Sequence, residues 1–167
     1  MGTYKRSMRA VRAIALVSAI VAGTLGLAGT ATAGDQVPFS GSLSGTVTVT
    51  PIAPPIASVL IEGTGLATQL GRFSVEVPHM VNQATRIATG TYVFTGANGD
   101  TLTADFSGQA TLLSPGVLSV AETGVITGGT GRFADATGSF TASRTFFAAT
   151  GVTTGSFSGT ISSVGSD

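Results

Sequence analysis

The sequence predicts an all-β protein, a single eight-stranded antiparallel barrel with glycine-rich turns. The first observation is strict alternation: in residues 39–50, every odd position is apolar or glycine and every even position is serine or threonine. Residues 101–112 and 153–162 repeat this pattern, whereas helical spacing is found nowhere over a comparable length. Such alternation gives a strand one dry face and one wet face.

The second observation is that turn-forming residues divide the chain at short intervals. Asn98-Gly99, between two alternating runs, is the strongest hairpin indicator. The expected turns lie at residues 51–55, 70–71, 81–83, 97–100, 114–116, 128–131 and 150–151. They leave eight candidate strands. A barrel removes the unpaired edges that a strand-rich chain exposes, and a two-sheet β-sandwich is the alternative.

The N-terminus is typical of a secretory signal. Basic residues at positions 5, 6, 9 and 12 precede an apolar stretch, which ends at Ala31-Thr32-Ala33. We expect cleavage between Ala33 and Gly34, a signal peptide over residues 1–33, a barrel domain over residues 34–167, and secretion. The alternative, a membrane anchor, is disfavoured because the apolar stretch is about 15 residues long and a span needs roughly 20.

Charge and cysteine content exclude several classes of function. Residues 34–167 hold four arginines against eight acidic residues, a net charge of −4 with no lysine. This balance predicts no nucleic-acid partner and no membrane partner after signal cleavage. Because the chain has no cysteine, disulfides, thiolate metal sites and cysteine nucleophiles are absent.

A glycine-rich segment, Gly129-Thr130-Gly131-Arg132-Phe133-Ala134, fits the spacing of a dinucleotide-binding loop. That loop requires a long helix after it and an acidic residue about 20 positions on. Here strand-like alternation resumes at Phe140, and no acidic residue follows Asp135 until Asp167. We therefore expect neither a nucleotide nor any other cofactor.

The same segment carries a family resemblance. Residues 128–138 resemble the G-G-T-G-x-F-x-x-A-x-G segment of the dirigent and allene oxide cyclase superfamily. The resemblance implies an eight-stranded barrel around a central ligand cavity, in a bacterial secreted member. It also implies that Phe133 fills one end of the barrel and that Gly128, Gly129, Gly131 and Gly138 allow the backbone to turn. A homo-oligomer, trimer or dimer, is suggested by the resemblance alone.

Candidate ligand-binding residues are charged or polar groups in the dry phase of a strand. Glu122 alternates with Val120, Arg144 alternates with Phe146, and Tyr92 alternates with Phe94. A charge on a dry face is costly unless it is paired or in contact with water or ligand. The alternative is a local bulge that turns Glu122 or Arg144 outward. Glu62 is a weaker third charge, because its neighbours make the phase ambiguous.

The single histidine, His79, cannot build a multi-histidine metal site within one chain, so no metal site is predicted. No G-x-S-x-G segment supports a serine triad around it. We expect His79 to be a residue at a strand end or rim.

Two classes of function follow. The first is a barrel that binds a small apolar molecule and guides a cyclisation or coupling by confinement, an isomerase-type activity without metal or nucleotide. The second is a non-enzymatic secreted or cell-surface barrel whose core is filled with side chains. Catalytic residues of family enzymes cannot be carried over, because nothing outside the glycine segment aligns, and the sequence leaves open whether the protein is an enzyme.

Overall fold

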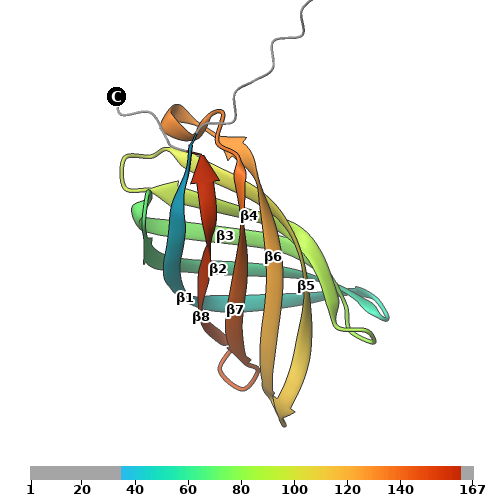
Figure 1. The fold of residues 1–167 in the computed structure, drawn as a ribbon. Coiled ribbons are helices and arrows are strands. Elements are labelled where there is room, and N and C mark those ends of the chain that lie inside the picture. The colour runs from blue at the N-terminus through green and yellow to red at the C-terminus, as the bar shows by residue number, and fades with distance from the viewer. Residues whose placement is uncertain (1–34, 163–167) are drawn as a thin grey trace, which may run out of the picture. The chain divides into compact units, whose positions relative to one another are not determined.

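The computed structural model describes residues 35–162 and places them in one closed antiparallel barrel of eight strands. Figure 1 shows the strands wrapping around a common axis. The elements are β1 (Gln36–Ala53), β2 (Ile56–Ala67), β3 (Gly71–Asn82), β4 (Ile87–Gly96), β5 (Thr101–Ser114), β6 (Val117–Gly129), the short 3₁₀ turn η1 (Gly131–Phe133), β7 (Gly138–Phe147) and β8 (Val152–Ser162). The prediction of an all-β, eight-stranded antiparallel barrel is confirmed. The expected signal peptide and its cleavage site at Ala33 and Gly34 lie outside the described residues.

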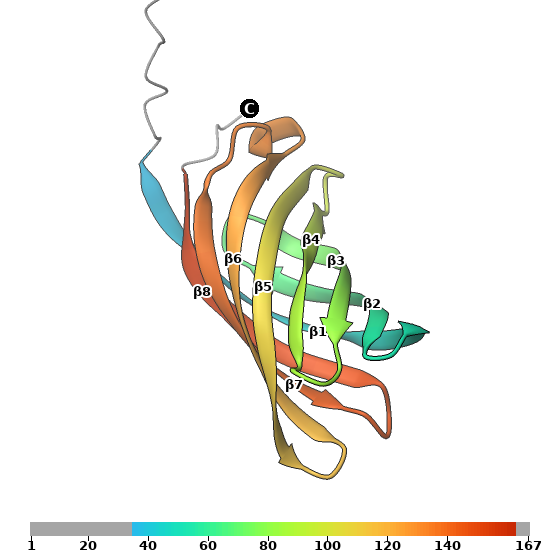
Figure 2. The ribbon, with the colours of Figure 1, turned by 90° about the vertical axis from the view of Figure 1, so that its right-hand side faces the viewer.

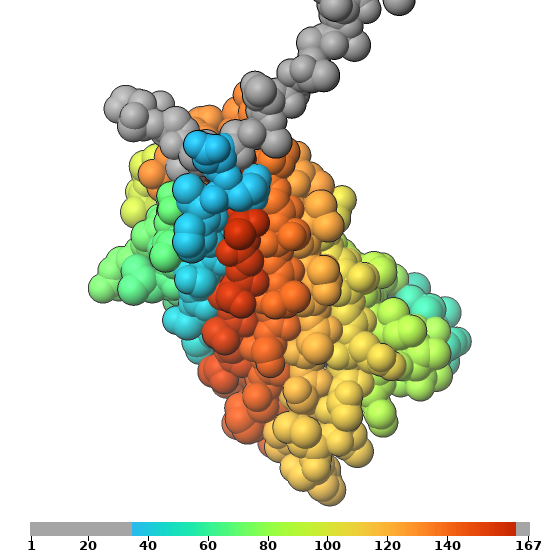
Figure 3. All heavy atoms as spheres, in the orientation of Figure 1, coloured from blue at the N-terminus to red at the C-terminus, as the bar shows by residue number. Residues whose placement is uncertain are grey.

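Each strand pairs with its neighbours in sequence, and β1 pairs with β8 to close the barrel. In that closing pair, Gly41 lies opposite Phe157 and Gly45 lies opposite Thr153. Figure 3 shows β1, β8, β7 and β6 as adjacent bands across one side of the surface. Closure leaves no sheet edge among these strands, which the predicted sandwich alternative would have retained.

The alternation in the sequence sets which side chains enter the barrel. Phe39 and Leu43 on β1, and Phe157 and Ile161 on β8, are buried, while the serines and threonines between them face outward. The core so formed is rich in aromatic rings, which pack at centroid separations such as 5.0 Å between Phe39 and Phe157. Such tilted contacts favour the aromatic packing beyond the area that it buries.

The two ends of the barrel differ. At one end, which we call the capped end, η1 follows β6 and buries Phe133 completely. The Arg132 guanidinium lies 4.8 Å from the centre of the Phe133 ring, and its Nη2 donates a hydrogen bond of 2.6 Å to the carbonyl oxygen of Gln69. These contacts tie the β2–β3 turn to η1.

At the other end, which we call the open end, lie the turns of the β1–β2, β3–β4, β5–β6 and β7–β8 hairpins. Figures 1 and 2 show these hairpins projecting on the side away from η1.

The glycine segment has the geometry of a tight turn. Gly128, Gly131 and Gly138 have φ values of 122°, 53° and 148°, conformations that residues with a Cβ rarely adopt. Gly129 lacks a positive φ, but a methyl group on it would overlap the carbonyl oxygen of Thr101 on the neighbouring strand. No helix long enough to present an anion site follows, since η1 has three residues.

Replacing Gly129 by alanine should destabilise the fold by roughly 3 kcal/mol, since the added methyl group has to displace backbone. The matched control is Gly96→Ala, at a position with ordinary φ where the nearest obstacle is the Asn98 side chain 3.1 Å away. Urea denaturation of both variants measures the difference. Equal, small losses of stability would contradict the close approach at Gly129.

Candidate functional site

Two opposite charges lie inside the barrel wall. Glu122 on β6 and Arg144 on β7 are 4% and 5% exposed, although both are surrounded by apolar positions of their strands. The Nη2 of Arg144 donates to Oε1 of Glu122, and its Nε donates to Oε2 at 3.0 Å. This two-point geometry matches the planar guanidinium to the carboxylate and neutralises both charges in place.

Two further side chains complete what we call the polar cluster: Tyr92, Glu122, Arg144 and Thr153. The Tyr92 hydroxyl on β4 donates to Oε2 of Glu122. The Nη1 of Arg144 donates to Oγ1 of Thr153 on β8 at 3.1 Å, and that hydroxyl donates in turn to the carbonyl oxygen of Thr145. The polar cluster therefore joins four strands across the interior.

Glycines on neighbouring strands make room for the two charged side chains. Gly108, on β5, lies opposite Glu122. Gly155, on β8, lies opposite Arg144. A methyl group on Gly155 would stand 2.6 Å from Cγ of Arg144, and one on Gly108 would overlap Cγ of Glu122. Long polar side chains enter this narrow barrel because the facing positions carry no side chain.

Burial changes the acid–base behaviour of the cluster. Burial, reinforced by the charge of Glu122, raises the pKa of the Tyr92 phenol, so Tyr92 stays protonated and serves as a donor. Burial alone lowers the pKa of Arg144, but the hydrogen bonds and charge of Glu122 outweigh it and the net direction is upward. The guanidinium therefore remains a cation.

A cavity of about 260 Å³ lies between the polar cluster and the open end of the barrel. Its wall is mainly aliphatic, with the ring of Phe146 on one side, and Glu122, Arg144 and His79 interrupt it. Tyr92 is not part of the lining, because it lies behind Glu122 and packs on Phe94 and Phe106. At the mouth stand Gln83, Arg86 and Gln109.

His79, expected at a strand end or rim, lies on the inner side of β3 and is half-buried against Phe106. Its Nδ1 is 2.9 Å from the carbonyl oxygen of Val77. Since a carbonyl only accepts, Nδ1 carries the proton in the neutral ring and Nε2 is left as an acceptor. Among residues 35–162, Arg132 Nε is the one buried side-chain polar atom without a partner. Nε2 of His79 forms no hydrogen bond and is therefore in contact with solvent.

Burial lowers the pKa of His79 from its usual value of 6.5, and the charge of Arg144 lowers it further, whereas the hydrogen bond to the Val77 carbonyl and the charge of Glu122 raise it. The ring is thus neutral at pH 7.

Three of the four polar residues predicted from the sequence lie inside the barrel, and the fourth does not. Glu122, Arg144 and Tyr92 come together inside the barrel, and the bulge alternative for Glu122 and Arg144 does not occur. Glu62 faces outward and is exposed. Thr153 and Arg86 were not anticipated. Thr153 stands in the dry phase of its strand with Phe157, a signal that the sequence did contain.

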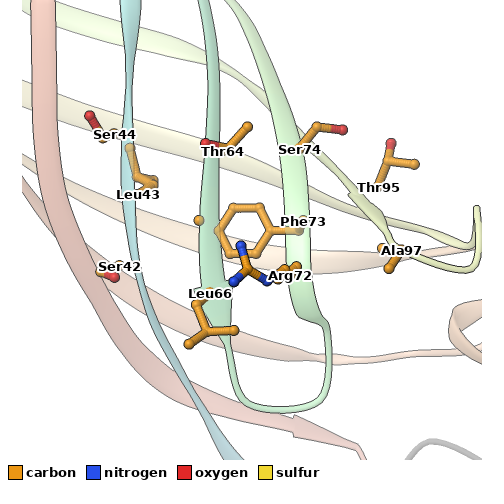
Figure 4. Close-up of a pocket in the computed structure, with 12 residues that line it drawn as sticks. Ser42, Leu43, Ser44, Thr64, Leu66, Arg72, Phe73, Ser74, Thr95 and Ala97 are labelled. Carbon is orange, nitrogen blue, oxygen red and sulfur yellow. The ribbon is translucent and has the colours of Figure 1, made fainter.

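A larger hollow, about 740 Å³, lies on the outside of the barrel and not at the polar cluster. It is a shallow depression across β1 to β4, and Figure 4 shows the residues around it. The hydroxyl-bearing residues Ser44, Thr64, Ser74 and Thr95 are direct cross-strand neighbours there. Arg72 is its only ionisable lining residue, so we assign the candidate site to the interior cavity.

The fold is that of a dirigent-like barrel. A solved structure of a pterocarpan synthase dirigent protein superposes with a TM-score of 0.51, covering 80% of this chain and 88% of that one, at 16% sequence identity. At this identity the likeness concerns the fold. No protein-family model and no curated protein sequence matches the chain.

In the part of the chain that the structure describes, no helix has the length and apolar character needed to cross a membrane.

Removing one partner of the buried ion pair should be costly, because the other charge is then left without compensation. We expect Glu122→Gln and Arg144→Met each to lower the free energy of unfolding by roughly 3–5 kcal/mol. The control is Glu62→Gln, an exposed position where the change should stay within about 0.5 kcal/mol. Denaturant melts provide the measurement, and near-neutral effects at Glu122 and Arg144 would contradict the buried pair.

Proposed function

We propose that this protein is secreted and binds a small, mostly apolar molecule in the cavity at the open end of its barrel. The observation that carries the proposal is the position of the polar cluster: Glu122 and Arg144, although buried as a pair, line the floor of the cavity. A largely apolar wall with a few convergent polar groups is typical of small-molecule sites.

The size of the cavity limits the ligand. At about 260 Å³ it is slightly below the range of roughly 300–1,000 Å³ that is usual for drug-sized molecules. A compact molecule of one or two rings, or a short chain folded on itself, suits this volume. Held between Val120, Phe146 and Ile61, it would have few orientations available.

Confinement is the chemistry that this site supports. The ion pair is internally neutralised and Tyr92 is held protonated, so neither supplies a free base to the cavity. An apolar intermediate bound here would be fixed in one conformation, which can direct a cyclisation or coupling by orientation alone. The dirigent-like fold is consistent with guided coupling, although the substrate of the solved neighbour does not transfer to this chain.

A filled structural barrel is the second candidate. It is favoured by the capped half, where Phe39, Phe94, Phe140 and Phe157 pack ring against ring. If that packing extended into the open half in solution, the protein would be a scaffold without a ligand.

A blocked cavity separates the two candidates. Ala110→Phe on β5 places a ring in the cavity lining, whereas Ala121→Phe on β6 places the same ring on the outer surface. Calorimetric titration with small aromatic probes such as 2-naphthol should show saturable binding to the wild type and to Ala121→Phe. Affinity for Ala110→Phe should fall by about tenfold or more, since a bound ring loses its buried contacts. No binding by any of the three proteins would favour the filled barrel.

Binding of a ligand with an O–H group should depend on pH through His79. The folded-state pKa of His79 lies below 6.5, so Nε2 can accept a hydrogen bond at pH 7 and loses this ability as the pH falls through that pKa. Affinity for 2-naphthol should therefore decrease in acid, while affinity for 2-methoxynaphthalene, which lacks the donor, should change little.

The variant His79→Gln keeps an acceptor but does not titrate, and it should remove the pH dependence while retaining the preference for 2-naphthol. Identical pH profiles for the two probes with the wild-type protein would contradict the role of His79. Stability should follow the same sign, because protonating a buried neutral ring disfavours the folded state at acid pH.

A further inference from the structure

The open end of the barrel carries an unusual concentration of exposed apolar side chains. Nine large apolar residues are exposed among those that the structure describes, and seven of them lie on the four open-end hairpins. We call these seven the apolar crown: Val49, Ile52, Met80, Ile87, Leu112, Leu113 and Phe147. The other two, Leu66 and Val125, lie elsewhere on the wall.

The crown arises because the alternation of the strands stops at this end. Along most of the outer wall a buried residue is followed by a serine or threonine that faces solvent. At the β5–β6 tip, Leu112 and Leu113 are both apolar, and at the β7–β8 tip Phe146 is followed by Phe147. At these two tips, apolar side chains therefore occupy both faces of the hairpin, and exposed apolar patches of this kind mark interaction surfaces.

The only charge at the tips of the four open-end hairpins is positive. Among residues 49–56, 80–87, 111–118 and 146–152, Arg86 is the only charged residue, and none is acidic. Its guanidinium forms no ion pair, since the one salt bridge within residues 35–162 joins Arg144 and Glu122. A surface with an apolar ring and one free cation complements the hydrocarbon edge and the phosphates of a lipid bilayer.

The crown and the cavity lie at the same end of the barrel. Val49 belongs to both, and Arg86 stands at the mouth. An apolar molecule dissolved in a bilayer could enter the cavity from a docked barrel without crossing water, which would avoid the cost of hydrating its apolar surface.

We propose that the apolar crown docks the open end of the barrel on a phospholipid bilayer surface, from which the cavity takes up its apolar ligand. The net charge of the chain predicted no membrane partner, but charge does not report on an apolar ring. A second copy of the chain fits less well, because two crowns meeting face to face would enclose two arginines with no acidic side chain on either to pair with them. The docking itself does not depend on the proposed ligand function.

The test uses two variants with the same substitution at equal exposure. Leu113, in the crown, is 62% exposed, and Leu66, outside it, is 61% exposed. Flotation of the secreted protein with phosphatidylcholine vesicles, and with vesicles that also contain phosphatidylglycerol, should recover the wild type and Leu66→Ser equally. Leu113→Ser should show a roughly tenfold lower partition coefficient, as expected for losing most of one leucine from an apolar contact. Equal flotation of the two variants, or none by the wild type, would overturn the proposal.

A second measurement reports the site of contact independently of any contribution from residues 1–34. Because the chain has no cysteine, Leu113→Cys and Leu66→Cys can each be labelled at one position with an environment-sensitive fluorophore. Vesicles should shift the emission of the label at position 113 to the blue and protect it from iodide, and leave the label at position 66 unchanged. Labels that respond alike would refute docking through the crown.

Light scattering tests the alternative that a second copy of the chain, and not a bilayer, covers the crown. If Leu113→Ser lowers the mass of the particle in solution and neither protein floats, the crown covers a second copy and the bilayer proposal is wrong. Binding of 2-naphthol in solution should be unchanged in Leu113→Ser, because this side chain is not part of the cavity lining. Loss of flotation and loss of ligand binding are therefore separate results.

Discussion

The ion pair between Glu122 and Arg144 is the interaction on which the interior of this barrel depends. Burying either charge alone costs several kcal/mol, and the pair offsets that cost only when its geometry is good and its remaining polar atoms are satisfied. Here the carboxylate accepts from Arg144 and from Tyr92, and the guanidinium also donates to Thr153. Because the partners of the pair, Tyr92 and Thr153, come from β4 and β8, the pair fixes the relative positions of strands that are far apart in the chain.

The polar cluster divides the interior into two halves with different roles. Toward the capped end, aromatic rings and Phe133 fill the barrel, and the Arg132 contacts hold η1 in place. Toward the open end, smaller aliphatic side chains such as Val47, Val59 and Ala88 leave a cavity. The packed half supplies stability, so the open half can remain empty enough to accept a ligand. The glycines opposite Glu122 and Arg144 allow this transition within a barrel of only eight strands.

Much of the fold could be predicted from the sequence because the period-two alternation is nearly unbroken. The phase of each strand made Glu122, Arg144 and Tyr92 candidates for inward positions, with a local bulge as the alternative for Glu122 and Arg144. It could not give the register between strands, so the pairing of Gly108 with Glu122 and of Gly155 with Arg144 emerges only from the structure. Thr153 was overlooked because threonine is the commonest outward residue here, although its phase is inward.

Other features depend on geometry that residue types do not encode. The tautomer of His79 follows from the position of the Val77 carbonyl, and the role of Arg86 at the mouth follows from the β3–β4 turn, where Arg86 itself has a φ of 59°. In the sequence, the apolar crown is visible only as consecutive apolar residues such as Leu112-Leu113. Its meaning required knowing that the four hairpins lie at the same end of the barrel.

A crystal structure of the protein with 2-naphthol tests the central claim most directly. The account predicts density for the probe in the open half of the barrel, against Val120 and Phe146, with its hydroxyl within hydrogen-bond distance of His79 Nε2. The Glu122–Arg144 pair should be intact beneath it. Side chains filling the open half, with Glu122 and Arg144 covered and no probe bound, would contradict it.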